Sequence, residues 1–346
     1  MITCFLSCVY RSTPLYGSFR TYDIYRRSLF RVCRRAASYS CYELTHRQLL
    51  SLRGEDTIVF LQGLITNDAE QLNNTYECRT LYAHLLNVQG RTLFDVLLYS
   101  VEDSQMKEHF VLLEHDNNIK DLLQKHVLFY KIRRKVSIVP CSSFSVWSVL
   151  PSEPAKEKEN IVQHVMDSKS ALFFGSDPRT AKMGWRLIVE NQVNPLQIIP
   201  DSRLGDIGEY HRHRYTLGLP EGVKDLPPGG CLPLESNLAY MNGVSFTKGC
   251  YIGQELTART HHTGVIRKRL MPVQFLESCE ATESSDVVTE TRKPVGKLRS
   301  CIGDLGLALL RQVNTMEKLF ILSTKNSWVQ IRAGIPDWWP KDDRNI

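Results

Sequence analysis

The sequence has 346 residues and a mass of 39.7 kDa, which is enough for two or three domains. Its 42% hydrophobic and 23% charged residues are typical of a globular chain, and no apolar run is long enough to predict a membrane-spanning helix. Ten cysteines are too few at this length for a small scaffold held together by disulfides.

The net charge of +6 lies wholly in the first forty residues, which hold seven arginines against a single acid, Asp23. Residues 41–346 are therefore neutral overall and have no net positive charge to attract nucleic acid. An Arg-rich, Ser-rich and acid-poor beginning is typical of a mitochondrial presequence, and the alternative is a disordered basic tail. We predict a transit peptide over residues 1–40 and a location in the mitochondrial matrix, where thiols stay mostly reduced.

The first half of the body mixes strand and helix patterns. Residues 44–62 indicate a short strand followed by a helix, Asn118–Phe129 has helical spacing, and Pro151–Asn160 is a polar loop. A turn at Asn87–Gly90 separates two predicted strands. The predicted strands of this half are Thr80–Asn87, Thr92–Val101, His109–Glu114, Val136–Val139 and Phe144–Leu150.

The second half continues with strands in Ala171–Val189, a helix over Leu204–Leu217 and a short helix over Ser236–Met241. Glu277–Thr291 is polar and predicts a mobile loop. A separate C-terminal β unit is predicted from the strands Ile266–Phe275, Leu305–Leu310, Leu319–Leu322 and Trp328–Ile331. Helices and strands mix without strict alternation, which favours an α+β fold.

The segment that carries chemistry is KGCYIGQELTAR, residues 248–259. Cys250 stands between Gly249 and Gly253, just before a predicted helix. The helix N-terminus and the neighbouring Lys248 would both favour a thiolate. Such a thiolate is a nucleophile, a redox thiol or a ligand for iron or copper, and the alternative is a buried structural cysteine.

Several common motifs are missing from the sequence. There is no C-x-x-C pair, no cluster-type spacing of four cysteines, no G-x-G-x-x-G and no Walker A loop. The adjacent His261 and His262 point to different sides of a regular element, so we expect surface or capping roles for them. Any iron–sulfur cluster bound by Cys250 would need its other ligands from a partner or a small thiol.

At Lys248–Glu255 the sequence resembles the signature of the YgfZ group of folate-binding-like proteins, relatives of the aminomethyltransferase of the glycine cleavage system. The resemblance extends over about residues 41–340. Its further stretches are Leu61–Asp68, Asn87–Asp95 and Leu219–Arg269. It implies an α+β fold with interleaved mixed α/β units around a central opening in residues 41–264, followed by a C-terminal β-barrel in residues 265–346.

With a presequence in front, the chain resembles the mitochondrial branch of this family, which acts late in the maturation of [4Fe-4S] proteins together with A-type carrier proteins. The resemblance implies a transient cluster shared with such a partner, with Cys250 as ligand or transfer thiol. The motif residues that would support Cys250 are Lys248, Gly249, Tyr251, Gly253, Gln254 and Glu255.

Two departures from the transferase relatives bear on activity. Those relatives carry adjacent aspartates where this chain has Phe94-Asp95, and a glutamate where it has Thr216. We therefore assign no catalytic residue. A folate-dependent one-carbon transferase, with Asp95 and Glu235 as tetrahydrofolate contacts, remains one alternative, and a non-catalytic docking scaffold is another.

Overall fold

A computed structural model describes residues 37–340, apart from 74–78, 104–107, 153–157, 265, 278–282, 312–316 and 325. Residues 37–346 form one compact unit, and most of the predicted transit peptide lies outside the described residues. The helices are α1 (Thr57–Gln62), α2 (Lys120–Lys131), α3 (Lys158–Asp167), α4 (Ile207–Thr216), α5 (Gly222–Asp225) and α6 (Gln254–Thr263).

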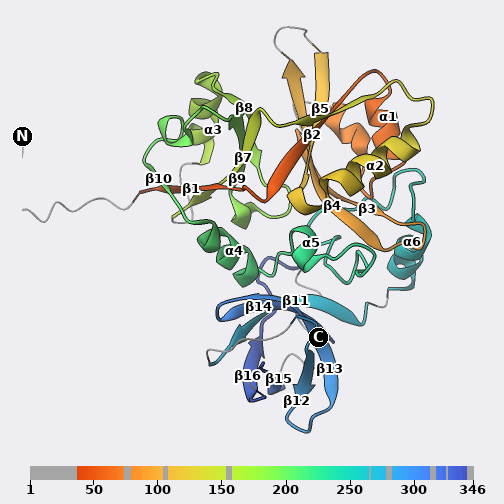
Figure 1. Cartoon of the computed structure of the whole chain (residues 1–346), viewed down its shortest axis with the longest axis vertical. Helices are drawn as coiled ribbons and strands as arrows, with labels where there is room; N and C mark the ends of the chain where they lie inside the picture. The colour runs from red at the N-terminus through yellow and green to blue at the C-terminus, as the bar shows by residue number, and fades with distance from the viewer. Residues whose placement is uncertain are drawn as a thin grey trace, which may run out of the picture. The chain divides into compact units, whose positions relative to one another are not determined.

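Two five-stranded sheets follow the orders β10-β1-β7-β9-β8 and β3-β4-β5-β2-β6 (Figure 1). The chain places β1 in the first sheet, builds the second from β2 to β6, and then returns to the first, so the two units are interleaved. This confirms the predicted α+β class. The strands are β1 (Tyr39–Glu43), β2 (Arg47–Arg53), β3 (Thr80–Leu86), β4 (Thr92–Asp103), β5 (Glu108–Asp116), β6 (Ser137–Cys141), β7 (Phe144–Pro151), β8 (Ala171–Ser176), β9 (Trp185–Glu190) and β10 (Ser202–Leu204).

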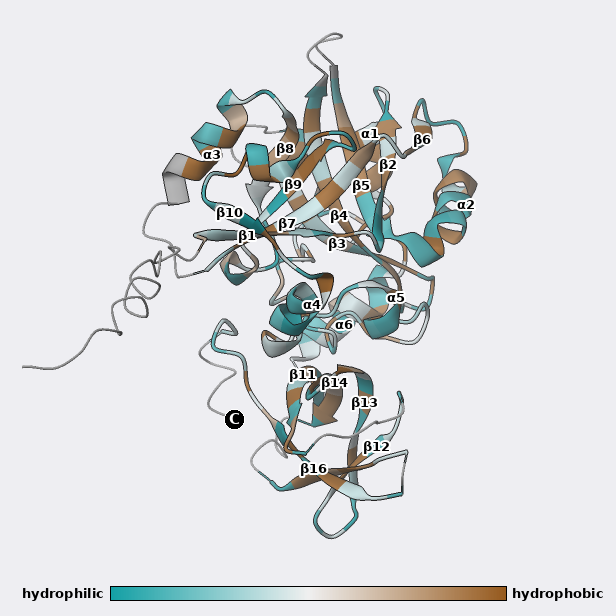
Figure 2. Ribbon diagram, turned by 60° about the vertical axis from the view of Figure 1, so that its left-hand side comes forward, coloured by the Kyte–Doolittle hydropathy of each residue, from teal (hydrophilic) through white to brown (hydrophobic). Residues whose placement is uncertain are grey.

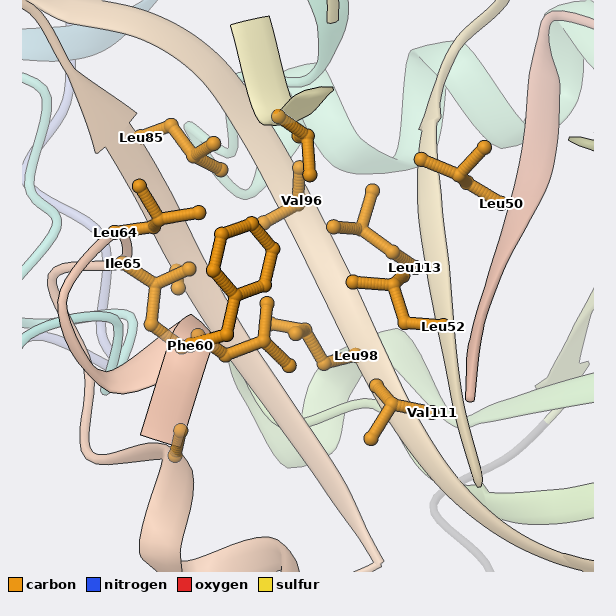
Figure 3. Close-up of a cluster of buried hydrophobic side chains, with 14 of the residues drawn as sticks. Leu50, Leu52, Phe60, Leu64, Ile65, Leu85, Val96, Leu98, Val111 and Leu113 are labelled. Carbon is orange, nitrogen blue, oxygen red and sulfur yellow. The ribbon is translucent and has the colours of Figure 1, made fainter. Parts of the chain in front are cut away.

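Strand β4 shows how the layers are held together. Successive side chains of a strand point to opposite faces of its sheet. Val96 and Leu98 enter a core that β2 to β5 share with α1 and α2, shown in Figure 3. Leu97 and Tyr99 enter a second core, which also contains Val146 of β7 and residues of β8 and β9. The second core therefore joins the two sheets.

The C-terminal part is a closed barrel in the order β11-β14-β13-β12-β15-β16, which confirms the predicted β-barrel. Asp225 of α5 ties the barrel to the rest, because its carboxylate accepts hydrogen bonds from Ser300 Oγ of β13 (2.6 Å) and Tyr215 Oη of α4 (2.8 Å). The barrel strands are β11 (Lys268–Phe275), β12 (Asp286–Thr289), β13 (Pro294–Ile302), β14 (Leu305–Arg311), β15 (Leu319–Leu322) and β16 (Trp328–Ala333).

Three local predictions are wrong. Residues 236–241 form consecutive turns, because Asn237 has φ +63° and interrupts a right-handed helix. Residues 286–289, expected in a mobile loop, form β12, because pairing with β13 and β15 closes the barrel. The predicted loop Pro151–Asn160 contains the first turn of α3. No helix in the described part of the chain is long and apolar enough to cross a membrane.

Candidate functional site

The segment of residues 245–253, called the signature loop below, leads into α6 and is held at both ends. The amide of Ser245 donates to the carbonyl of Thr66 (3.1 Å), and the amide of Ile252 donates to that of Gly63 (3.1 Å). Cys250 lies between these anchors and is exposed, unlike the other cysteines in the described ranges. The loop therefore presents one accessible thiol from a backbone fixed on either side.

Lys248 fastens the same loop to the end of α1. Its Nζ donates to the carbonyl oxygens of Gln62 (2.8 Å), Ile65 (2.8 Å) and Asn67 (2.6 Å). Burial lowers the pKa of Lys248 to about 8. These carbonyls take all three N–H groups of the ammonium, which holds the loop in place, while the support of Cys250 by Lys248 stays a prediction. Its role is to position the loop at the negative end of a helix.

Two glycines join the signature loop to the β3–β4 turn. Gly90 and Gly253 both have φ +79°, a conformation that favours glycine. A Cβ on Gly253 would lie 2.3 Å from the carbonyl oxygen of Asn87, and a Cβ on Gly90 would lie 2.9 Å from that of Gly253. The two backbones can approach this closely only because both residues lack a side chain.

Tyr251 and Gln254 complete the anchorage. Tyr251 is 7% exposed, and burial raises its pKa to about 12. The ammonium of Lys248 lies 5.1 Å from the centre of the Tyr251 ring. The backbone amide of Gln254 donates to the Tyr251 carbonyl (3.3 Å), and the side-chain Oε1 of Gln254 accepts the backbone amide of Tyr251 (3.4 Å). This pair of hydrogen bonds closes the turn before α6.

The remaining motif residues face outward. Glu255 is exposed and pairs with Arg259 one turn along α6, so it does not cap the helix start. A Cβ built on Gly249 meets no atom within 4 Å. No neighbouring atom therefore requires a glycine at position 249, in contrast to position 253.

Asp95 belongs to a buried network of ion pairs. It is 3% exposed, its Oδ2 lies 3.3 Å from Arg47 Nη1, and its Oδ1 accepts the amide of Gly222 (3.1 Å). Phe94 points to the opposite face of β4 and is buried in the hydrophobic core. Both oxygens of Asp95 are thus engaged within the protein.

Glu221 lies at the centre of the same network. Its Oε2 accepts hydrogen bonds from Arg179 Nη1 (2.8 Å), Arg186 Nη2 (2.9 Å) and Tyr210 Oη (2.7 Å), and its Oε1 lies 2.9 Å from His46 Nε2. Arg179 and Arg186 hold the pKa of Glu221 well below its usual range, against the opposing effect of burial. Sequence reasoning missed this network, because no contiguous motif contains it.

Glu235, the second expected folate contact, is half-buried elsewhere. It lines a cavity of about 220 Å³ together with Leu256 and Thr257 of α6, and Asp95 does not line that cavity. Burial raises the pKa of Glu235. The structure therefore places the two expected folate contacts in different surroundings.

Within the described residues, no group of three or more His, Cys, Asp or Glu side chains is placed to hold a metal ion. His261 and His262 are exposed in the last turn of α6, and the His261 ring stacks on Phe246 at 3.6 Å between ring centres. Cys250 is a single accessible thiol, and the described residues place no set of metal-ligating side chains around it.

Two interleaved sheets followed by a closed C-terminal barrel define an aminomethyltransferase-like fold. The chain is similar to the solved glycine cleavage system aminomethyltransferase T of Bartonella henselae, with a TM-score of 0.67, 11% identity, and coverage of 87% of this chain and 86% of that one. That likeness concerns the fold. Residues 267–341 match the family model described as "CAF17, C-terminal beta-barrel domain".

Curated relatives give the family. The chain is 48% identical to the mitochondrial iron–sulfur cluster assembly factor IBA57 of Homo sapiens and 46% identical to that of Mus musculus, each over 88% of this chain and 86% of the relative. A homologue from Mycosarcoma maydis is 30% identical over 89% of this chain and 86% of its own length. The chain belongs to the IBA57 family of mitochondrial iron–sulfur cluster assembly factors. The predicted resemblance, function class and mitochondrial location are confirmed.

Proposed function

We propose that Cys250 is a ligand of an iron–sulfur cluster that this chain shares with an A-type carrier protein, in the late steps that produce [4Fe-4S] centres in the mitochondrial matrix. The observation that carries the proposal is the exposure of Cys250 on a loop fastened by Lys248 and Gly253. A fixed, accessible thiol can approach a cluster held by another protein without rearrangement of its own backbone.

The ligand chemistry explains why a partner is needed. Iron–sulfur clusters are commonly held by four cysteine thiolates. Cys250 supplies one sulfur. Among the described residues, no three His, Cys, Asp or Glu side chains lie together in a position to hold a metal ion. The remaining ligands come from the carrier. The cluster is cargo in this scheme, and the shared arrangement allows it to pass onward when the carrier or the target protein takes over the Cys250 position.

The proposed division of the chain follows from these roles. We propose a transit peptide that ends by residue 36, because β1 begins at Tyr39 and pairs with β7 and β10, followed by a cluster-presenting α+β region up to 264 and a barrel over 265–346. The boundary after 264 falls between the end of α6 at Thr263 and the start of β11 at Lys268.

Anaerobic absorption and circular dichroism spectra test the proposal. The chain is mixed with an A-type carrier loaded with a [2Fe-2S] cluster, beside Cys250→Ser and the control Cys141→Ser, whose thiol is half-buried in the edge strand β6. We expect a new cluster spectrum on a one-to-one complex for the wild type and the control, and its loss in Cys250→Ser. An identical spectrum in all three proteins would contradict a ligand role for Cys250.

The same mixture separates the alternatives. Normal cluster transfer by Cys250→Ala would favour a docking scaffold. Turnover of an aminomethyl donor with tetrahydrofolate would favour a transferase, although Phe94 lies in the hydrophobic core where the transferases have an aspartate.

A further inference from the structure

Helix α2 has apolar side chains on two sides. Ile119, just before the helix, and Leu123 and Val127 are 6%, 0% and 1% exposed and pack into the core of the second sheet. On the other side, Leu122 and Phe129 are 53% and 75% exposed. The inward stripe explains why the helix packs on the sheet. The Phe129 ring meets the Tyr130 ring edge-on at 5.0 Å between ring centres and still remains largely exposed.

The exposed apolar residues extend along α2 to its C-cap. Leu128 is 46% exposed, and Ile132, the C-cap residue, is 82% exposed. Ile132 has φ +39°, a region that β-branched residues rarely adopt. The fold thus holds a large aliphatic side chain in water at a strained backbone position, which core packing does not require.

Cations surround these apolar side chains. Lys125 lies on the outward side of α2, and Lys131 and Arg133 follow at its end, each without an acidic partner among the described residues. Farther along, Arg134 and Lys135 are placed beside Asp56 and Glu55. In Figure 2, α2 carries both hydrophilic and hydrophobic colours along its length. We call this set of residues, Leu122, Lys125, Leu128, Phe129, Lys131, Ile132 and Arg133, the α2 surface.

We propose that the α2 surface docks this protein on a membrane that contains anionic phospholipids. Exposed Phe and Leu side chains among unpaired lysines and arginines match the boundary between phosphate groups and acyl chains, where apolar tips enter and cations stay with the phosphates. Charge complementarity identifies the occupant, because residues 41–346 carry no net charge while the α2 surface concentrates the three cations Lys125, Lys131 and Arg133. The inference is independent of the role of Cys250.

Vesicle sedimentation tests the proposal. The test uses residues 37–346, the compact unit, because the arginines of the leader would themselves bind anionic lipid. Vesicles of phosphatidylcholine alone are compared with vesicles that also contain cardiolipin. We expect binding to the cardiolipin vesicles only, weakened by salt, since these electrostatic attractions are screened within a Debye length.

Two variants and a matched control locate the contact. Phe129→Ser with Ile132→Ser removes the apolar tips, and Lys125→Gln with Arg133→Gln removes two cations. Each pair should weaken binding by about tenfold or more, since one cation near an anionic surface is worth about fivefold. Leu204→Ser removes a side chain of similar exposure (60%) from β10 and should leave binding unchanged.

Three results would overturn the proposal. The first is no binding of the wild type to cardiolipin vesicles, and the second is equal binding by the wild type and both α2 variants. The third is loss of carrier binding in the α2 variants without any vesicle present, which would make this surface a protein interface. Unchanged circular dichroism of the variants shows that they fold.

Discussion

Replacing Gly253 by alanine tests how the signature loop is held. The new Cβ would lie 2.3 Å from the carbonyl oxygen of Asn87, 2.8 Å from Cβ of Leu86 and 3.2 Å from Cα of Gly90. The first and last of these are backbone atoms, so rotation of a side chain cannot relieve the contacts. The loop must move away from the β3–β4 turn, and Cys250 moves with it.

The magnitude follows from two effects. An alanine at φ +79° costs about 1–2 kcal/mol relative to glycine. Overpacking against fixed neighbours costs about 1–3 kcal/mol. We therefore expect Gly253→Ala to lower the free energy of unfolding by about 2–5 kcal/mol in urea titrations, and to weaken formation of the shared cluster with a loaded carrier.

Gly249→Ala is the matched control, because it makes the same substitution four residues earlier in the same loop. Its Cβ meets no atom within 4 Å and its φ is not positive, so its free energy of unfolding should stay within about 0.5 kcal/mol of the wild type. Equal stability of the Gly253→Ala and Gly249→Ala proteins would refute this account of the loop.

Three other substitutions test separate parts of the structure. Lys248→Met removes the ammonium that donates to three carbonyl oxygens, and it should lower the free energy of unfolding by about 3 kcal/mol in urea titrations. Lys248→Arg should give an intermediate loss. An unchanged free energy of unfolding in Lys248→Met would contradict the positioning role. Glu221→Gln should cost about 3–5 kcal/mol at neutral pH, because it leaves buried arginines without their partner. The pKa of Glu221 is depressed in the folded state, so its stabilisation is present above the unfolded pKa of about 4.3 and is lost as the pH falls below it. Urea titrations from neutral to acidic pH should therefore show a flatter profile for the variant, and parallel profiles would count against the network. Asp225→Ala, which removes the acceptor of Ser300, should lower the thermal midpoint of the barrel and the α+β region together, and an unchanged midpoint would argue against that anchorage.

Features that are formed by adjacent residues could be predicted from the sequence. KGCYIGQE gives the family, the loop and Cys250, because all eight residues are adjacent and two glycines mark a turn. The main α+β elements follow from apolar periodicity. The barrel is predicted in outline, although β12 and β13 are missed. The two valines of β12 lie at the end of a polar segment, and they form a strand through pairing with β13 and β15.

Contacts between distant segments could not be predicted in this way. Gly90 and Gly253 belong to two motifs that were each identified, yet no local pattern indicates that they touch. Lys248 looks like a neighbour of Cys250 in sequence, whereas its ammonium is bound by carbonyls after α1. The Glu221 network combines residues from several strands and helices, so only the folded chain brings its charges together.

The central claim is that Cys250 completes a cluster whose other ligands belong to a carrier. Native mass spectrometry of the anaerobic mixture with a loaded A-type carrier tests this most directly. The account predicts one mass, equal to one chain, one carrier and one cluster, for the wild type and for Cys141→Ser, and only separate proteins for Cys250→Ser. A complex of Cys250→Ser that still retains the cluster at wild-type abundance would contradict it.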